Sequence, residues 1–355
     1  MKIGIIFGTR PEVIKVAPVY MKALEMGLEV RAIATAQHRQ MMDMMLKVFN
    51  ITPDYDMNIM TQNQSLNTVA AKVITYLDEY ITKEKFDWIF VQGDTTTAMA
   101  SAIAAFHRGA KVGHIEAGLR SGDLYDPFPE EMNRQVIDRV AELMFAPTEI
   151  SAYNLESEGF SKERIKITGN TVVDALNFIS EKFDLDKARE KVIDVRDYVL
   201  VTLHRRENWG TKMAAILEGI KRFSLEYNIP IVFPVHLNPK VREVVNPILK
   251  EYKNAILLEP VDYITFLSLL KGAKIVASDS GGVQEEAPSF SKYVVVCRNT
   301  TERPELIQSG FGTLAGTTAE SVYKALVNGV SVNLTNLKNP FGDGNAAGKI
   351  LNAII

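Results

Sequence analysis

The sequence contains a single cysteine, Cys297, among its 355 residues. One cysteine can form neither an internal disulfide nor a cysteine-based zinc site, so we expect a protein of the reducing cytoplasm. No apolar run is long enough to span a bilayer, and we identify no signal peptide at the N-terminus. The net charge of -3 gives no basic footprint, so we expect neither nucleic acid nor an anionic membrane as a partner.

The sequence also lacks the glycine patterns of common nucleotide-binding loops. Residues 8–12 form a first strand-to-helix turn, which offers Gly8 alone where G-x-G-x-x-G needs three glycines, so we predict no NAD. The glycine-rich tail fails as a Walker A loop, because Ile350 follows Lys349 and the glycine spacing is short. No ligand cluster calls for a metal, and we expect neither a cofactor nor a metal ion.

Short apolar strands that alternate with amphipathic helices fill most of the chain. Residues 2–7, 88–91 and 110–115 are such strands, and the same alternation resumes at residues 198–202. A chain of this length exceeds a comfortable single core, which favours two domains. We therefore predict the α/β class, with a parallel sheet in each half.

Carboxylates follow two of the predicted strands. In an open parallel sheet the binding crevice lies outside the carboxyl ends of the strands, and Asp94 and Glu116 both stand at such ends. Asp94 is interpreted equally well as a helix N-cap. Glu116 lies between a buried strand and a glycine turn, where the sequence shows no capping role. Glu130 and Glu131 open the next helix, and one of the two can be purely structural.

A strand, a glycine turn and a helix start follow one another in residues 274–288. We expect Asp279 and Ser280 to cap this helix, while Gly281 and Gly282 let a phosphate approach backbone N–H groups aligned with the helix dipole. An ordinary capped turn explains these residues alone equally well.

Basic side chains at other strand ends favour the anion-binding interpretation. Arg10 can grip a phosphate with both arms of its guanidinium, and Lys15 follows about one helical turn later. His204, Arg205 and Arg206 cluster where a strand turns into a helix, which combines permanent charge with one group that titrates near neutrality.

Motifs along the whole chain resemble the non-hydrolysing UDP-N-acetylglucosamine 2-epimerases. They are residues 8–12 (GTRPE), 93–95 (GDT), 114–118 (HIEAG), 127–131 (PFPEE), 202–208 (TLHRREN), 279–288 (DSGGVQEEAP) and 300–305 (TTERPE). The resemblance implies a glycosyltransferase-B-like pair of Rossmann-like domains facing across a cleft, usually in a homodimer. Residues 1–168 would carry the acid/base carboxylates and 169–340 would bind UDP, while the C-terminal helix of 341–355 crosses back to the first domain.

The resemblance also implies an isomerase that interconverts UDP-N-acetylglucosamine and UDP-N-acetylmannosamine for cell-surface polysaccharide. By position in the matched motifs, Asp94, Glu116 and Glu130 are the acid/base residues and His204 is a catalytic histidine beside the diphosphate. The residues implied to hold UDP are Arg10, Ser280, Gly281 and Gly282 at phosphate, Glu286 at the ribose diol, Phe266 at the uracil face, and Lys15 and Arg303 beside the diphosphate. Val261 replaces a usual Gln, so a side-chain contact to the base would be lost and a backbone contact kept.

Some bacterial members of this family bind a second, activating UDP-N-acetylglucosamine beside the active site. The residues that resemble this allosteric pattern are Gln37, Gln40, Gln64, Arg205 and His236, whereas Asn63 stands where an Arg is usual.

Four other functions fit parts of the sequence. One is a hydrolysing epimerase that releases free N-acetylmannosamine and UDP, and another is an epimerase of a UDP-diacetamido-uronate. The third is a UDP-sugar-binding regulator without turnover, and the fourth is a glycosyltransferase of the same fold, which would need an acceptor. Residues 10–12 and 202–208 favour the non-hydrolysing epimerase.

Overall fold

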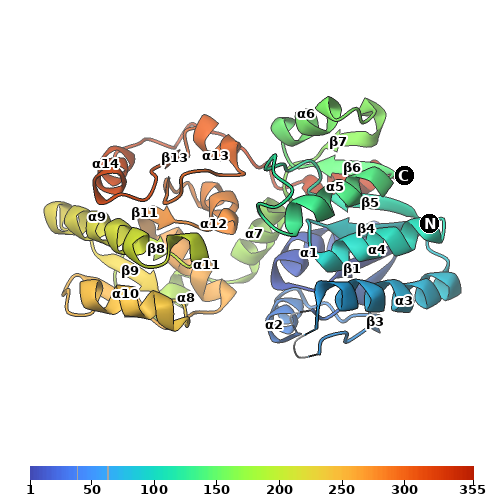
Figure 1. Ribbon diagram of the computed structural model, residues 1–355, viewed down its shortest axis with the longest axis horizontal. Helices are drawn as coiled ribbons and strands as arrows, with labels where there is room; N and C mark the ends of the chain where they lie inside the picture. Colours follow the sequence, from blue (N-terminus) through green and yellow to red (C-terminus); the bar gives the residue numbers. More distant parts are fainter. Residues whose placement is uncertain (38, 62–63) are drawn as a thin grey trace. The chain divides into compact units, whose positions relative to one another are not determined.

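Two parallel sheets organise the chain in a computed structural model that describes residues 1–37, 39–61 and 64–355. Unit 1 consists of Met1–Ala175 together with Phe341–Ile355, and unit 2 consists of Leu176–Pro340. Figure 1 shows a sheet with covering helices in each unit. The division between the units falls inside a helix, a few residues beyond residue 168.

Unit 1 contains a seven-stranded sheet. Its strands are β1 (Lys2–Phe7), β2 (Glu29–Ala34), β3 (Tyr55–Asp56), β4 (Trp88–Gln92), β5 (Lys111–Ile115), β6 (Leu143–Ala146) and β7 (Ile165–Ile167). Its helices are α1 (Arg10–Glu25), α2 (Arg39–Phe49), α3 (Leu66–Glu84), α4 (Thr96–His107), α5 (Glu130–Val140), α6 (Glu149–Ser157), η1 (Lys162–Arg164), the start of α7 (Thr171–Lys182) and α15 (Ala346–Asn352). Helices α3, α4 and α5 pack in a row in front of this sheet (Figure 1).

Unit 2 contains a six-stranded sheet. Its strands are β8 (Tyr198–Thr202), β9 (Ile231–Pro234), β10 (Ala255–Leu258), β11 (Ala273–Ser278), β12 (Val294–Val296) and β13 (Gly312–Leu314). Its helices are α8 (Leu185–Glu190), η2 (Arg206–Asn208), α9 (Thr211–Tyr227), α10 (Pro239–Leu249), α11 (Tyr263–Gly272), α12 (Gly281–Glu286), η3 (Ala287–Phe290), α13 (Pro304–Gln308) and α14 (Ala319–Gly329).

Both sheets reverse their strand order once. The order is β3-β2-β1-β4-β5-β6-β7 in unit 1 and β10-β9-β8-β11-β12-β13 in unit 2. The order therefore reverses between β1 and β4, and again between β8 and β11. Ligands of open parallel sheets bind at such switch points, outside the carboxyl ends of the strands. The predicted fold class of two Rossmann-like parallel α/β domains is confirmed.

The central strands are mostly apolar and almost continuously buried because helices cover both of their faces. All five residues of β4 are buried, and so are the last four residues of β11. This continuous burial is typical of parallel sheets and makes the strand ends, where the chain turns, the places for polar side chains. None of the helices in the described ranges is both long and apolar enough to cross a membrane.

The C-terminal segment Phe341–Ile355 docks within unit 1. Helix α15 packs against α1, and the carboxylate of Asp174 accepts hydrogen bonds from the N–H groups of Ala346 (3.2 Å) and Ala347 (2.9 Å) at the start of α15. Burial raises the pKa of Asp174, although these two hydrogen bonds oppose the shift. The backbone N–H of Asn170 also donates to the carbonyl of Phe341, at 2.7 Å.

Candidate active site

The turns that leave β1 and β4 meet at the switch point of unit 1 through the side chain of Glu12. One carboxylate oxygen of Glu12 accepts hydrogen bonds from the backbone N–H groups of Gly8 (2.8 Å) and Thr9 (2.7 Å). The other accepts a hydrogen bond from the hydroxyl of Thr95 in the second turn, at 2.6 Å. Burial raises the pKa of Glu12 against the effect of these donors. Glu12 thereby fixes the loop on which Arg10, the half-buried first residue of α1, is mounted.

Asp94 points its carboxylate at an arginine of α5. The guanidinium of Arg134 donates to Asp94 at 2.5 Å and to Glu131 at 2.8 Å, and the Asn133 side chain donates to the Asp94 carbonyl at 2.8 Å. The alternative in which Asp94 caps α4 is wrong, because Thr95 is the N-cap and accepts a hydrogen bond from Ala98 N–H at 3.0 Å. The carboxylate of Asp94 is therefore available for a role other than capping.

Glu116 is a buried carboxylate in an unfavourable backbone conformation. Its φ of 69° lies in the left-handed region, which costs a non-glycine residue about 1–3 kcal/mol and is found most often at functional sites. Lys15 and Gln92 donate hydrogen bonds to its two oxygens, and Asn170 donates at 3.2 Å. A Cβ atom at Gly93 would lie 3.8 Å from Glu116 Oε2, so this carboxylate lies beside the turn that carries Asp94.

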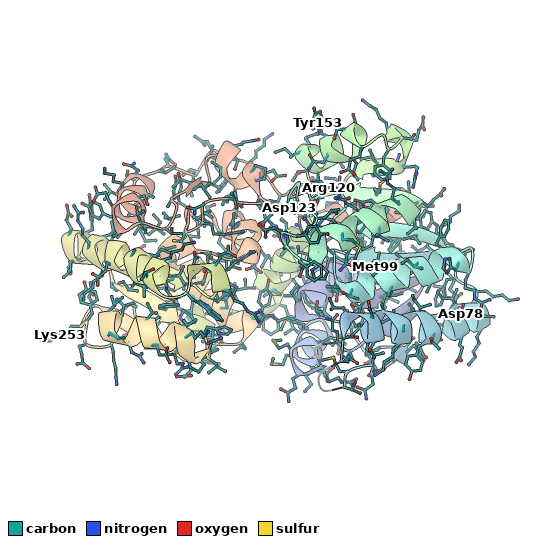
Figure 2. All side chains as sticks on the ribbon, viewed as in Figure 1. Asp78, Met99, Arg120, Asp123, Tyr153 and Lys253 are labelled. Carbon is teal, nitrogen blue, oxygen red and sulfur yellow. The ribbon has the colours of Figure 1, made fainter. Side chains whose placement is uncertain are left out.

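The connection from β5 to α5 is held by a buried network. His114 contacts Asp138 through Nδ1 (2.6 Å) and the carbonyl of Gly93 through Nε2 (2.8 Å). The guanidinium of Arg120 donates to Asp138 at 2.7 Å and to Glu158 at 2.6 Å. Burial opposes the charge of Arg120, but these carboxylates outweigh it and hold its pKa above the ordinary value. Figure 2 labels Arg120 in this connection, which ends where α5 begins.

The two glutamates at the start of α5 differ in their surroundings. Glu131 is fully buried and accepts hydrogen bonds from Arg134, from the Gln135 side chain at 3.0 Å and from the backbone N–H of Ser121 at 3.0 Å. Glu130 is the first residue of the helix and is partly exposed. The structural role that the sequence allowed for one of the two therefore belongs to Glu131.

At the switch point of unit 2, Asp279 organises the loop that carries His204. Its fully buried carboxylate accepts hydrogen bonds from the backbone N–H groups of His204 (3.1 Å) and Arg205 (3.1 Å) and from the Asn208 side chain (3.0 Å). His204 Nδ1 lies 3.2 Å from the same carboxylate. Burial alone would raise the pKa of Asp279, but His204, Asn208 and Arg205 outweigh burial and hold it below the ordinary value.

The predicted capping of α12 by Asp279 and Ser280 is wrong. Ser280 is the N-cap but makes no side-chain capping bond, and the Asp279 carboxylate is engaged by the β8 loop instead. The backbone at this helix start is nevertheless open. A Cβ atom at Gly281 would lie 3.5 Å from the guanidinium carbon of Arg303, and Gly282 is exposed.

Glu286 ends α12 and Arg303 is the N-cap of α13, and both have partners within unit 2. Arg303 pairs with Glu285 at 2.8 Å and with Glu302 at 3.6 Å. Burial opposes ionisation of Glu302, but Arg298 and Arg303 outweigh it and lower its pKa to about 2. The buried carboxylate of Glu286 accepts a hydrogen bond from the hydroxyl of Tyr263 at 2.7 Å.

Phe266 and Val261 lie on the same segment of unit 2 as Tyr263. Phe266 belongs to α11 and is partly exposed. Val261 precedes Asp262, whose side chain caps α11 by accepting a hydrogen bond from Thr265 N–H at 3.0 Å.

The residues of the predicted allosteric pattern fall in both units. In unit 1, the Gln37 side chain accepts a hydrogen bond from Thr97 at 3.2 Å, the Gln64 side chain accepts one from Lys72 at 3.2 Å, and Gln40 is exposed. In unit 2, the ring of His236 stacks beside that of His204 with centroids 6.3 Å apart, and Arg205 follows His204 in the chain. Asn63 lies outside the described residues.

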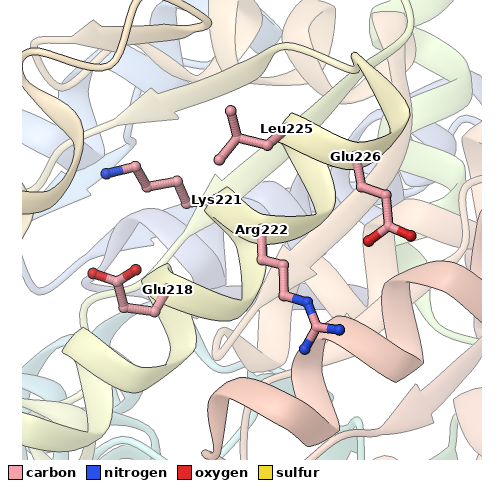
Figure 3. Close-up of a pocket in the computed structure, with 5 residues that line it drawn as sticks. All are labelled: Glu218, Lys221, Arg222, Leu225 and Glu226. Atoms are coloured by element: carbon pink, nitrogen blue, oxygen red, sulfur yellow. The ribbon is translucent and has the colours of Figure 1, made fainter.

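A separate hollow on the surface of unit 2 contains none of the predicted site residues. It is lined by Glu218, Lys221, Arg222, Leu225 and Glu226 of α9 (Figure 3). Its charges are of both signs, and Arg222 already pairs with Glu320 at 2.8 Å. We assign this hollow no function.

Several residues that hold the site were not identified in the sequence: Glu12, Gln92, Arg134, Asn170 and Asp279 in its observed role. Glu12 and Gln92 carried a local signal, since one stands three residues after a threonine N-cap and the other is a polar residue that ends a buried strand. Arg134 and Asn170 contact carboxylates that lie 40 and 54 residues earlier in the chain, and no local sequence pattern predicts such pairs.

Comparisons with known proteins match the chain over both units. A family model described as UDP-N-acetylglucosamine 2-epimerase matches residues 22–355. The UDP-N-acetylglucosamine 2-epimerase of Escherichia coli (strain K12) is 43% identical over 369 residues, which cover 100% of this chain and 98% of the relative.

Two solved structures are similar over the full chain. One is the crystal structure of UDP-GlcNAc 2-epimerase from Neisseria meningitidis bound to UDP-GlcNAc, with a TM-score of 0.91 and 40% identity, covering 100% of this chain and 99% of that one. The other is the Methanocaldococcus jannaschii UDP-GlcNAc 2-epimerase in complex with UDP-GlcNAc and UDP, with a TM-score of 0.85 and 35% identity, covering 100% and 99% of the two chains.

Proposed function

The chain belongs to the UDP-N-acetylglucosamine 2-epimerase family, and from this premise we propose that it reversibly interconverts UDP-N-acetylglucosamine and UDP-N-acetylmannosamine. The observation that carries the proposal is the full-length similarity to an epimerase solved with UDP-GlcNAc bound. The proposal is also supported by the carboxylates at the unit 1 switch point, which can transfer protons, and by the His204 loop at the unit 2 switch point, which can bind a diphosphate.

The chemistry of the substrate favours an elimination. The C2 proton of the sugar is not adjacent to a carbonyl, so its simple removal would leave an unstabilised carbanion. If a carboxylate takes this proton while the C1–O bond breaks, UDP leaves with the bonding electron pair and a C1=C2 double bond forms. The product, 2-acetamidoglucal, then receives a proton at C2 from the other face while a UDP oxygen re-adds at C1.

We propose Asp94, Glu116 and Glu130 as the acid/base residues. Glu116 is suited to accept a proton, because Lys15, Gln92 and Asn170 all donate to its carboxylate and favour the ionised form. Asp94 is oriented by Arg134, which holds its carboxylate at 2.5 Å.

Residues of unit 2 would hold the leaving group. His204, oriented by Asp279, is proposed to donate to the diphosphate as negative charge develops on it. The other proposed contacts are Ser280, Gly281, Gly282, Arg10, Lys15 and Arg303 at the diphosphate, Glu286 at the ribose and Phe266 at the uracil. Lys15 and Arg303 already pair with Glu116 and Glu285, so each would contact phosphate beside a carboxylate that it also stabilises.

We further propose that the enzyme acts in the cytoplasm as a homodimer, with residues 1–168 in the acid/base role and 169–340 in the UDP-binding role. Gln37, Gln40, Gln64, Arg205 and His236 are proposed to bind a second, activating UDP-sugar. The hydrogen bonds that already involve Gln37 and Gln64 support fixed positions for these amides.

The test is incubation with UDP-N-acetylglucosamine in deuterated water, followed by NMR. We expect deuterium at C2 of both UDP-sugars and no net release of UDP. Accumulation of free N-acetylmannosamine and UDP would instead identify the hydrolysing reaction. If no deuterium enters C2 at any enzyme concentration, the proposed function is wrong and binding without turnover is left.

A further inference from the structure

We propose that Asn170 is a positioning residue for the reaction and that it links the carboxylate of Glu116 to the C-terminal segment Phe341–Ile355. The inference rests on the proposed function, because Glu116 has a proton to transfer only in that reaction. In this role Asn170 need not contact the reacting atoms itself. It acts by holding the side chain that does.

The contacts of Asn170 leave its amide one orientation. The residue is buried, with 4% of its surface exposed. Its Oδ1 accepts a hydrogen bond from the backbone N–H of Val172 at 3.0 Å, at the start of α7, and its Nδ2 donates to Glu116 Oε1 at 3.2 Å. Exchanging the two ends of the amide would place a donor against Val172 N–H and an oxygen against the Glu116 carboxylate. The Val172 contact therefore points the N–H donor of Asn170 at Glu116.

The backbone of Asn170 is held by the C-terminal segment. Its N–H donates to the Phe341 carbonyl at 2.7 Å. Next to this bond Gly169 and Gly342 pack against each other, and a Cβ atom on Gly342 would lie only 3.1 Å from Gly169 Cα. Both glycines have positive φ, 89° and 125°, so neither position suits a side chain. Close approach of the two segments is thus built into the sequence.

A second anchor keeps the Phe341 carbonyl in place. The Asp174 carboxylate receives the first N–H groups of α15 from Ala346 and Ala347, a few residues beyond Gly342. The tail is therefore tied to the β7–α7 region on both sides of Asn170. A chain position far from Glu116 in sequence thereby contributes to the geometry of the catalytic carboxylate.

The groups that face Glu116 have different tasks. Lys15 of α1 supplies a full positive charge, whereas Gln92 of β4 and Asn170 supply directed neutral donors. Loss of a donor favours the protonated acid over the carboxylate, and a protonated Glu116 cannot accept the C2 proton. Loss of Asn170 should therefore reduce turnover most at low pH, where protonation competes.

The test compares Asn170→Asp and Asn170→Ser with the wild-type enzyme, by the pH dependence of kcat and by UDP affinity. Both variants keep an acceptor for Val172 N–H, but the aspartate places a second carboxylate against Glu116 and the shorter serine cannot reach it. We expect the acidic limb of kcat to move upward by about one pH unit or more in Asn170→Asp and by less in Asn170→Ser. UDP affinity should change less than about twofold, because in the proposed role Asn170 acts on Glu116 and not on the nucleotide.

Asn154→Asp is the matched control, since Asn154 donates its amide to the Gly118 carbonyl at 3.0 Å rather than to Glu116. It should lower the unfolding midpoint without moving the acidic limb. A loss of kcat by the same factor at every pH in both Asn170 variants would mean a merely structural role and would overturn the inference, as would unchanged profiles.

Gly342→Ala approaches the same link from the tail and leaves every side chain near Glu116 intact. It should move the acidic limb in the same direction as Asn170→Ser, and an unmoved limb in this folded variant would overturn the role given to the tail. A wild-type enzyme without deuterium incorporation would refute the proposed function first, which is a different result from a failure of the variants alone.

Discussion

Replacing Asp279 by Asn should destabilise unit 2 severely, because a buried anion there gathers several donors. The carboxylate is fully buried and accepts hydrogen bonds from His204 N–H, Arg205 N–H and the Asn208 side chain. In Asp279→Asn the amide oxygen can take the place of Oδ2, which faces all three donors, but it accepts their hydrogen bonds as a neutral group. Three hydrogen bonds that change from a charged to a neutral acceptor, at about 1 kcal/mol each, predict a loss of about 3 kcal/mol of unfolding free energy.

This loss should be visible both thermally and in its pH dependence. For a domain of this size it corresponds to a fall of the unfolding midpoint of about 10 °C. The pKa of Asp279 is lower in the folded protein than its ordinary value of 3.8, so the folded state is stabilised by ionisation above pH 3.8. That contribution is lost as the pH falls through the lower folded-state pKa. The difference between wild type and variant should therefore be full at pH 7 and shrink in strongly acidic solution.

The assay is urea unfolding followed by tryptophan fluorescence in a Trp88→Phe background. Trp209 then reports on the loop directly, because its indole N–H donates to the His204 carbonyl at 3.2 Å. Asp262→Asn is the control, since Asp262 is an exposed N-cap for which asparagine is an equally good replacement. A difference below about 1 kcal/mol at pH 7, or one that stays constant down to pH 3, would refute a charged anchor at Asp279.

Three further outcomes test the unit 1 site. Glu116→Gln should keep UDP affinity, measured by calorimetry, and lower deuterium incorporation at C2 by about 100-fold or more; an effect on affinity alone would contradict its acid/base role. Arg10→Ala should weaken UDP binding by about tenfold or more in the same titration, and unchanged affinity would remove Arg10 from the phosphate site. Glu12→Gln should flatten the pH dependence of stability. Burial raises the folded-state pKa of Glu12 above 4.5, so wild-type stability should fall as the pH rises from 4.5 through that raised pKa. Urea unfolding at pH 4 to 8 can check this.

The longer strands of both sheets could be predicted from sequence, because each appears as an apolar run that is followed by residues with helical periodicity. The two outermost short strands carried too little pattern: β3 has two residues and β13 has three. Two or three residues are too few for a hydrophobic pattern to distinguish a strand from a loop. Their pairing is decided by neighbouring strands rather than by their own residues.

The candidate site divides in the same way. The positions of Asp94 and Glu116 after the ends of β4 and β5 could be predicted from the apolar runs before them, and strand ends have a fixed place in a parallel sheet. The capping role of Asp279 was mispredicted because Asp before a helix is the usual N-cap signal, whereas here the donors of the β8 loop compete for its carboxylate and win. Pairs such as Arg134 with Asp94 join separate elements, so only the folded chain shows them.

The return of Phe341–Ile355 to unit 1 has a consequence for biosynthesis. Because the N-terminus of a chain leaves the ribosome first, all of Leu176–Pro340 emerges while unit 1 still lacks its last segment. Unit 2 can therefore fold while unit 1 is incomplete, because Asp174 and Asn170 still lack their partners Ala347 and Phe341. Unit 1 can therefore be completed only after all of unit 2 has been synthesised, and a chain truncated before Phe341 would contain a complete unit 2 and an unfinished unit 1.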